Sequence, residues 1–361
     1  SGQATLRVWL LLHDGSDAGL VYRFYHRFAA PPADGIPDWL RGVRTHYYDF
    51  LSPLSSGGPR GGGFEENAAC FKDFSVGLAT CHGTYSHWGD YIHPDRAEWL
   101  AMRGDVAGSV RLSLDHLRSL RDLSHANGAR FAMYIHLAGF DKASPLWQDL
   151  QDSVRIAKSG EAPVYPWHGP DIENEAVFMS IASDAWVEHL LQQVAWLLEC
   201  IDPDAIVVDE TFAGIGFDHH PERYCITSGH MIRFMKRLRK LIKDAGADKA
   251  LLTSDCGLAP FALWADGEAG DCAYDAFLGQ PAFRARLGGE ASLLGERPWI
   301  PCAWQGVGMW GEQMDLARRV GAGVGLGNGW IEYGGFAGLP QGLRSRILDD
   351  IAELSPSRRA P

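Results

Sequence analysis

A short apolar run that ends in two carboxylates is the strongest chemical signal in this chain. Residues 206–208 are apolar and β-branched, and Asp209 and Glu210 follow them directly. Carboxylates at the edge of an apolar region are candidates for a shifted pKa, which acids, bases and nucleophiles need. Because successive strand residues point to opposite faces, we expect only one of the two to face a site. We assign Asp209 as the nucleophile and keep Glu210 as its substitute; alternatively, both cap a helix or pair with an arginine.

A second carboxyl group is required if Asp209 acts in glycoside hydrolysis. That reaction uses two carboxyl groups, about 5–5.5 Å apart for retention of configuration and about 6.5–9.5 Å apart for inversion. Asp255 ends a later apolar run, Glu268 lies in the loop that we expect after it, and Asp275 ends the run after that. We rank Asp255 first and Glu268 second as the acid/base. The alternative for each is a solvated loop carboxylate.

Polar and aromatic side chains follow the other apolar runs of the chain in the same way. Aromatic rings stack on sugar faces, while carboxylates and amides bind sugar hydroxyls. The alternative for the histidine at 136 is a hydrogen-bonded residue at the rim of a barrel. We predict that a carbohydrate substrate is bound by the following residues: Asp49, His82, Tyr85, Trp88, His136, Glu210, Asp275, Trp304 and Trp330.

Histidines raise a metal-dependent alternative. Three of them, placed together, would suit a zinc hydrolase built on a barrel. We prefer to interpret them as sugar contacts, so the prediction is an enzyme without a cofactor or metal. A second alternative is a carbohydrate-binding barrel that does no chemistry. The histidines in question are His82, His87, His136, His219 and His220.

Eight apolar runs supply the strands that would hold these side chains. Helical patterns lie between several of them, most clearly at 110–126, 184–200 and 230–244, and strands that alternate with helices favour a parallel sheet. Eight such units over about 300 residues predict an α/β fold, the (β/α)8 or TIM barrel. The glycine cluster at 57–63 fits no phosphate-binding motif, which disfavours a nucleotide-binding sheet. The predicted strands are 43–50, 74–81, 130–137, 205–210, 250–255, 271–277 (or a start at 261–264), 299–304 and 323–328.

The first forty residues differ from the rest. They contain two strand-like runs, 6–12 and 20–28, followed by a proline-rich linker. Two strands alone are marginally stable. We therefore divide the chain into 1–40 and 41–361. The first part is a short β segment that either caps the barrel or is the remnant of an upstream β-domain, and the second is the catalytic barrel.

Charge and composition exclude several partner classes. The 361 residues carry 33 Lys+Arg and 45 Asp+Glu, a formal net charge of -12, so we expect no nucleic-acid partner. No apolar run approaches the roughly 20 residues that span a bilayer, so we expect a soluble protein with no membrane contact. Seven scattered cysteines indicate buried thiols. We expect the protein to be located in the cytoplasm, or outside the cell after removal of a signal peptide. The oligomeric state is left open.

These features resemble the (β/α)8 superfamily of retaining α-glycosidases, which includes α-galactosidases, α-glucosidases and dextranase-like enzymes. The resemblance covers about residues 40–350 and centres on the run Ile206–Val208 before Asp209, where those enzymes carry an aspartate nucleophile after the fourth strand. Val207-Val208-Asp209 stands where α-galactosidases carry Lys-Trp-Asp or Lys-Tyr-Asp. The resemblance implies a glycoside hydrolase that degrades an oligo- or polysaccharide with retention, and an acid/base after strand five or six.

Overall fold

The computed structural model describes most of the barrel and omits the chain's two ends and several connections. The described residues are 35–50, 63–101, 111–165, 176–211, 216–254, 264–271, 297–302, 308, 310–327, 333 and 335–354. The strands predicted at 6–12 and 20–28 lie outside these residues, so the division at residue 40 stays a prediction.

Eight parallel strands form a nearly closed barrel, as the sequence predicted. Their order around the sheet is β13-β12-β11-β8-β5-β2-β1-β14, and every neighbouring pair is parallel. The two ends of the sheet meet where the backbone N–H of Gly323 donates to the carbonyl of Trp299 at 2.7 Å. The strands are β1 (Thr45–Phe50), β2 (Leu78–His82), β5 (Arg130–His136), β8 (Ala205–Asp209), β11 (Ala250–Ser254), β12 (Gly267–Asp271), β13 (Trp299–Cys302) and β14 (Val324–Gly327).

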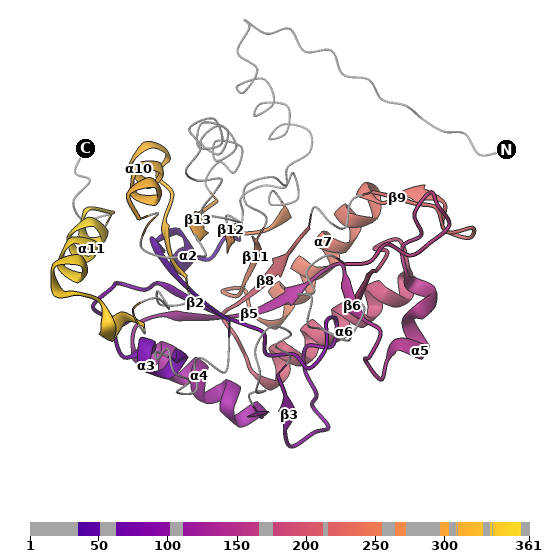
Figure 1. Ribbon diagram of the computed structural model, residues 1–361, viewed down its shortest axis with the longest axis horizontal. Coiled ribbons are helices and arrows are strands. Elements are labelled where there is room, and N and C mark those ends of the chain that lie inside the picture. The colour runs from indigo at the N-terminus through magenta and orange to yellow at the C-terminus, as the bar shows by residue number, and fades with distance from the viewer. Residues whose placement is uncertain are drawn as a thin grey trace, which may run out of the picture.

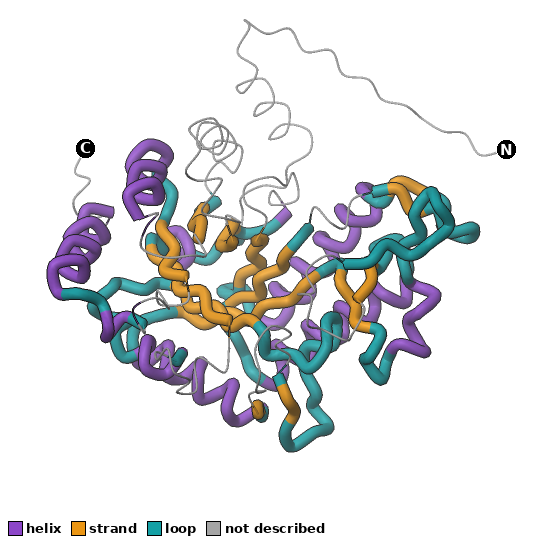
Figure 2. The backbone as a smooth tube through the Cα atoms, viewed as in Figure 1, coloured by secondary structure: helices purple, strands orange, loops and turns teal. Residues whose placement is uncertain are grey.

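Helices surround the strands, which occupy the centre of the molecule in Figures 1 and 2. The three predicted helices are present as α4 (Leu114–Ala126), α6 (Asp184–Cys200) and α7 (Ser228–Ala245), each with buried apolar residues on one side. No helix in the described parts of the chain is long and apolar enough to cross a membrane. The other helices are α2 (Asp38–Arg41), α3 (Phe64–Ala68), α5 (Trp147–Leu150), α10 (Trp310–Val320) and α11 (Gln341–Leu354), with single turns η2 (Gln151–Ser153) and η7 (Phe336–Gly338).

Three small antiparallel sheets extend the connections between barrel strands and helices. One of them, β6–β7, belongs to the connection after β5, and another, β9–β10, to the connection after β8. Both therefore rise from the carboxyl ends of barrel strands, where active sites of this fold lie. The pairs are β3 (Trp99–Leu100) with β4 (Arg111–Leu112), β6 (Gly139–Asp141) with β7 (Ala176–Phe178), and β9 (Phe217–Asp218) with β10 (Cys225–Ile226).

The sixth strand lies where neither sequence prediction placed it. It spans Gly267–Asp271 and pairs with β11 and β13, so the prediction of 271–277, or of a start at 261–264, is wrong. Its first residue is a glycine because space is short: a Cβ at Gly267 would lie 2.9 Å from the carbonyl oxygen of Pro298. A strand made of Gly, Glu, Ala and Asp lacks the β-branched pattern on which strand prediction depends.

The amino end of the barrel is filled with apolar side chains. Leu78, Val207 and Leu252 point inward and form one cluster with Ile36 and Leu40 from the segment before β1. The outward-facing strand residues pack against the helices in a second, larger cluster. The inner cluster therefore closes the amino end of the barrel interior.

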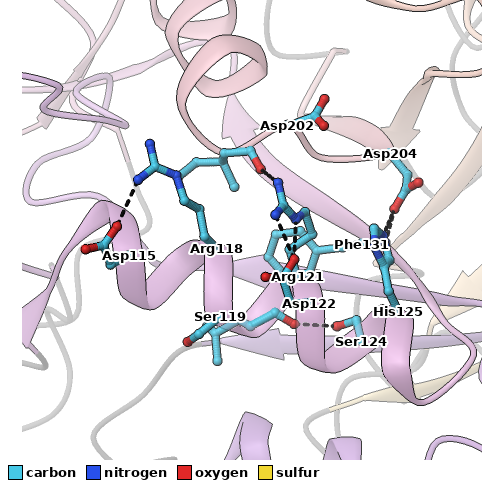
Figure 3. A network of polar contacts seen from close by, with 12 residues as sticks. Asp115, Arg118, Ser119, Arg121, Asp122, Ser124, His125, Phe131, Asp202 and Asp204 are labelled. Carbon is cyan, nitrogen blue, oxygen red and sulfur yellow. Dashed lines mark hydrogen bonds and ion pairs between the residues drawn. The ribbon is translucent and has the colours of Figure 1, made fainter.

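Asp204 ties three strands together at the amino end, as Figure 3 shows for its contacts with α4 and β5. Its carboxylate accepts from the backbone N–H of Phe131 at 2.8 Å and from the His125 ring at 2.6 Å, and its carbonyl accepts from the N–H of Ala250 at 2.9 Å. Burial acts to raise the pKa of Asp204, but these hydrogen bonds and that from Arg130 outweigh it and lower the pKa. This carboxylate is therefore structural.

Candidate active site

Asp209 lies at the carboxyl end of β8, where its partly buried carboxylate faces the mouth of the barrel. The hydroxyl of Tyr134 donates to its Oδ2 at 2.6 Å, and the backbone N–H of Glu210 donates to its Oδ1 at 2.9 Å. Tyr134 comes from β5, the neighbouring strand, so two adjacent strands fix this carboxylate. Burial and the negative charge of Glu210 raise the pKa of Asp209 to about 6.

Glu210 also faces the mouth, contrary to the alternation that predicted opposite faces for the two carboxylates. Its φ angle is +52°, in the left-handed region, because β8 has ended at Asp209. This turn of the backbone brings Glu210 Oε2 to 3.0 Å from Nε2 of His136. The side chain is 8% exposed. Two carboxylates from consecutive residues therefore share the mouth.

His136, the last residue of β5, is held in one tautomer by its surroundings. Its Nδ1 accepts hydrogen bonds from the backbone N–H groups of Gly139 at 2.8 Å and Ala138 at 3.2 Å. A nitrogen that accepts cannot carry the proton, so the ring donates from Nε2. That donor lies toward Glu210. His136 is fully buried. The hydroxyl of Tyr91 accepts from the backbone N–H of His136 and donates to its backbone carbonyl.

Tyr165 completes this network from the connection after β6. Its hydroxyl lies 2.7 Å from His136 Nε2 and is hydrogen-bonded to the carboxylate of Glu210. Burial and the charges of Glu210 and Asp209 raise the pKa of Tyr165, so this hydroxyl keeps its proton. Glu210 thus receives donors from a histidine and a tyrosine, which favour its negatively charged form.

An aromatic wall lines the mouth beside Asp209. We define it as His82, Tyr85, Trp88 and Tyr134. The His82 and Tyr134 rings are 3.8 Å apart, and Tyr85 and Trp88 are 4.9 Å apart. Trp88 also packs edge-on against His136 at 4.8 Å, and its indole Nε1 is a buried donor with no hydrogen-bond partner among the described residues. The wall presents ring surface and one available N–H group.

The predicted site residues are therefore only partly brought together. Six of them lie together at the mouth of the barrel: Asp209, Glu210, His82, Tyr85, Trp88 and His136. Asp49 lies in β1, but its side chain is outside the described part. Four predicted residues fall wholly outside the described residues: Asp255, Asp275, Trp304 and Trp330.

Glu268 lies in strand β12 and not in a loop, which corrects the expected position. It pairs in register with Thr253 and Trp299, whereas its neighbour Ala269 belongs to the inner cluster of the barrel. By the alternation of strand side chains, Glu268 faces outward. This placement separates it from the side of the sheet that carries Asp209.

Two tyrosines of the site were not predicted. Tyr134 stands two residues before His136 on β5, so period-two alternation places both on the inner face and would have identified it. Tyr165 lies in a long connection with no strand or helix pattern around it. Only the folded chain brings it to Glu210.

The five histidines considered for a metal do not form one set of ligands. His82 packs on Tyr134 and His136 bonds to Glu210, whereas His219 lies beside β9 and stacks on Phe217. Within the residues that the structure describes, no three His, Cys, Asp or Glu side chains are placed to hold a metal ion.

Known proteins resemble this chain in fold but not in sequence. No protein-family model and no curated protein matches it. Solved structures do match. An alpha-galactosidase from Thermus thermophilus, in complex with p-nitrophenyl alpha-D-galactopyranoside, superposes with a TM-score of 0.60 at 15% identity over 92% of this chain and 65% of that one.

Two further structures share the barrel. The GH36 alpha-galactosidase AgaB from Geobacillus stearothermophilus gives a TM-score of 0.60 at 11% identity, over 95% of this chain and 45% of that one. The cycloisomaltooligosaccharide glucanotransferase from Paenibacillus sp., complexed with cycloisomaltoheptaose, gives 0.54 at 11% identity, over 74% and 39%. The chain therefore spans only part of the length of these proteins. The predicted resemblance to the α-glycosidase barrel is confirmed at the level of the fold.

Proposed function

We propose that this protein is a glycoside hydrolase that cleaves an oligo- or polysaccharide by a two-carboxylate, retaining mechanism. The observation that carries the proposal is the position of Asp209: a partly buried carboxylate at the carboxyl end of the fourth barrel strand, bonded by Tyr134 and flanked by an aromatic wall. The barrel neighbours that act on galactosides and glucans support it.

In this mechanism Asp209 attacks the anomeric carbon. Its two hydrogen bonds, from Tyr134 and from the N–H of Glu210, hold the carboxylate in one orientation for the attack. A second carboxylic acid protonates the leaving oxygen, and a covalent glycosyl-enzyme forms; the same group then activates water to release the sugar. Asp255, which follows β11 directly in the chain, stays the candidate for this acid/base because β11 is the strand next to β8.

The remaining groups of the mouth bind the sugar. Trp88 Nε1–H is available to donate to a sugar hydroxyl, because it has no hydrogen-bond partner among the described residues. The rings of the aromatic wall offer a surface on which a sugar can stack. Glu210, held by His136 and Tyr165, places a second negative charge next to Asp209. That charge stabilises the oxocarbenium-like transition state through its field.

The test is hydrolysis of a panel of aryl α- and β-glycosides by the wild type and Asp209→Asn, with EDTA in parallel. We expect EDTA-insensitive turnover in the wild type and a loss of at least about 10³-fold in the variant. Asp122→Asn, on the exposed surface of α4, is the matched control and should retain full activity. The anomer formed first, followed by proton NMR, distinguishes retention from inversion.

Two results would redirect the assignment. Activity that EDTA abolishes would favour the metal-assisted alternative. Saturable sugar binding without turnover, equal in wild type and Asp209→Asn, would identify a non-catalytic carbohydrate-binding barrel.

A further inference from the structure

A two-stranded hairpin after the candidate nucleophile exposes an unusual amount of aromatic surface. This rim hairpin, residues 216–227, contains β9 and β10 and lies at the right-hand edge of the molecule in Figure 1. Phe217 is 47% exposed, Tyr224 65% and Ile226 57%. Phe217 and Ile226 pair across the two strands, so they share one face. The exposed apolar residues are therefore grouped, and not scattered.

The rings of the rim hairpin contact one another and form a platform. Phe217 stacks on His219 at 5.3 Å, and Tyr224 meets Phe217 edge-on at 5.7 Å and His219 at 5.3 Å. Aromatic faces supported in this way suit flat, partly apolar ligands that also offer hydroxyl groups. The rings of sugars have this character.

The rim hairpin is anchored, although it exposes these rings. Asp218 is fully buried and accepts from the backbone N–H of Ile156 at 3.1 Å and from Nε of Arg223 at 3.3 Å. Arg223 also donates to the carbonyl of Asp152 at 2.7 Å, and Thr227 bonds the backbone of Gly216 to close the base. A platform fixed before binding loses little conformational entropy when a ligand arrives.

Contacts connect the rim hairpin to the candidate active site. Tyr165, which bonds Glu210, packs on Phe178 at 5.1 Å, and the guanidinium of Arg155 lies 4.6 Å from the same ring. Nη1 of the same guanidinium lies 3.1 Å from where a Cβ of Gly216 would stand. Glu210 and the rim hairpin also both follow β8 in the chain. This series of contacts links the base of the platform to the candidate active site.

We propose that the rim hairpin is a remote binding platform for a saccharide chain whose cleaved bond lies at Asp209. This inference rests on the proposed glycosidase function and narrows its substrate: a chain long enough to reach from the mouth to Phe217 and Tyr224, rather than a single terminal sugar. Sugar units far from the bond that breaks stack on the exposed rings. They strengthen binding without contacting the reacting atoms.

The test measures binding to polymers separately from turnover. Native gels cast with dextran, galactomannan or soluble starch report binding as retarded migration. The wild type should be retarded by at least one polymer, and Phe217→Ala/Tyr224→Ala should bind that polymer at least about tenfold more weakly. Tyr224→Phe keeps the ring and should behave as wild type. Leu100→Ala, which removes a similarly exposed residue (48%) from β3, is the matched control.

The readouts separate this inference from the proposed function. The double variant should hydrolyse an aryl monosaccharide with unchanged kcat/KM, and Asp209→Asn should still be retarded by the polymer. Hairpin-dependent retardation without any glycosidase activity would refute the proposed function and leave the platform standing. The platform is refuted if no polymer retards the wild type, or if the double variant is retarded equally. It is also refuted if size-exclusion chromatography shows that the two substitutions break a dimer, because the surface would then be a protein interface.

Discussion

Replacing Asp209 with asparagine should stabilise the fold at neutral pH while it removes activity. The substitution keeps the shape of the side chain and both of its contacts. The amide oxygen accepts from the N–H of Glu210, and the amide nitrogen donates to the hydroxyl of Tyr134, since a hydroxyl both donates and accepts. Only the negative charge is lost.

The magnitude follows from the raised pKa of Asp209. Burial and the charge of Glu210 move that pKa from 3.8 to about 6 on folding. A carboxyl group with a raised folded-state pKa contributes stability that is complete below its unfolded pKa and is lost as the pH rises through the folded pKa. Each pH unit between the two values is worth about 1.4 kcal/mol, so the ionised wild type is less stable by about 3 kcal/mol at pH 8. Asparagine avoids that cost.

Asp204 supplies a control of opposite sign directly before the same strand. Hydrogen bonds lower its pKa in the folded protein, so it contributes stability above its unfolded pKa and loses it as the pH falls through the folded pKa. Asp204→Asn should therefore destabilise at pH 8, and its effect should shrink toward acid pH. The two aspartates differ in the sign of their effect because Asp209 lies beside the negative charge of Glu210, whereas Asp204 accepts hydrogen bonds from Phe131 N–H and from the side chains of His125 and Arg130.

Urea unfolding followed by tryptophan fluorescence measures both variants at pH 4 and pH 8. For Asp209→Asn we expect a gain in the free energy of unfolding of about 3 kcal/mol at pH 8 and less than about 1 kcal/mol at pH 4. A gain that does not change with pH, or a loss of stability at pH 8, would refute the electrostatic reasoning. Equal signs for the two variants would refute the distinction between the two ends of β8.

Three further outcomes follow from the site and the barrel. Glu210→Gln removes a negative charge beside Asp209 and should lower the pKa of Asp209 from its value of about 6. The acid limb of the profile of kcat/KM against pH, where Asp209 gains its proton, should therefore move to lower pH. An acid limb that does not move would contradict the electrostatic coupling of the two carboxylates. Tyr165→Phe deletes a hydrogen bond to a charged group and should lower kcat/KM about tenfold without unfolding the protein, as circular dichroism would check. Gly267→Ala should cost about 1–3 kcal/mol in urea unfolding, because its Cβ would press on the carbonyl oxygen of Pro298; a neutral effect would show that β12 can shift.

The barrel was predictable because seven of its strands are apolar runs that end in polar or aromatic residues. β8 is the clearest: Val207 is inward, Val208 outward, and Asp209 comes at the end. The sixth strand escaped prediction for a steric reason. Close packing against Pro298 leaves room only for glycine at 267, and a glycine-rich segment carries no hydrophobic pattern.

Within the site, residues on regular strands were predictable and those placed by loops were not. His136 and Asp209 are opposite each other in the register of β5 and β8. Glu210 departs from strand geometry, and no pattern in its neighbours signals a positive φ angle. Tyr165 reaches Glu210 only through the packing of a long connection. The polar partners that set the charge of the site therefore had to come from the structure.

The left-handed backbone conformation of Glu210 determines whether its negative charge lies at the barrel mouth. In an extended conformation, Glu210 would continue the alternation of β8 and carry its carboxylate to the helix-packed side of the sheet. These two residues would then place one negative charge at the mouth instead of two, and His136 would lose the carboxylate that lies 3.0 Å from its Nε2. Whether one or both of these carboxylates face the substrate thus depends on the backbone conformation at residue 210 as well as on the sequence. A redesign of the turn after β8 that returns residue 210 to an extended conformation would halve the charge that Asp209 and Glu210 place at the mouth, with both acidic residues left in the sequence.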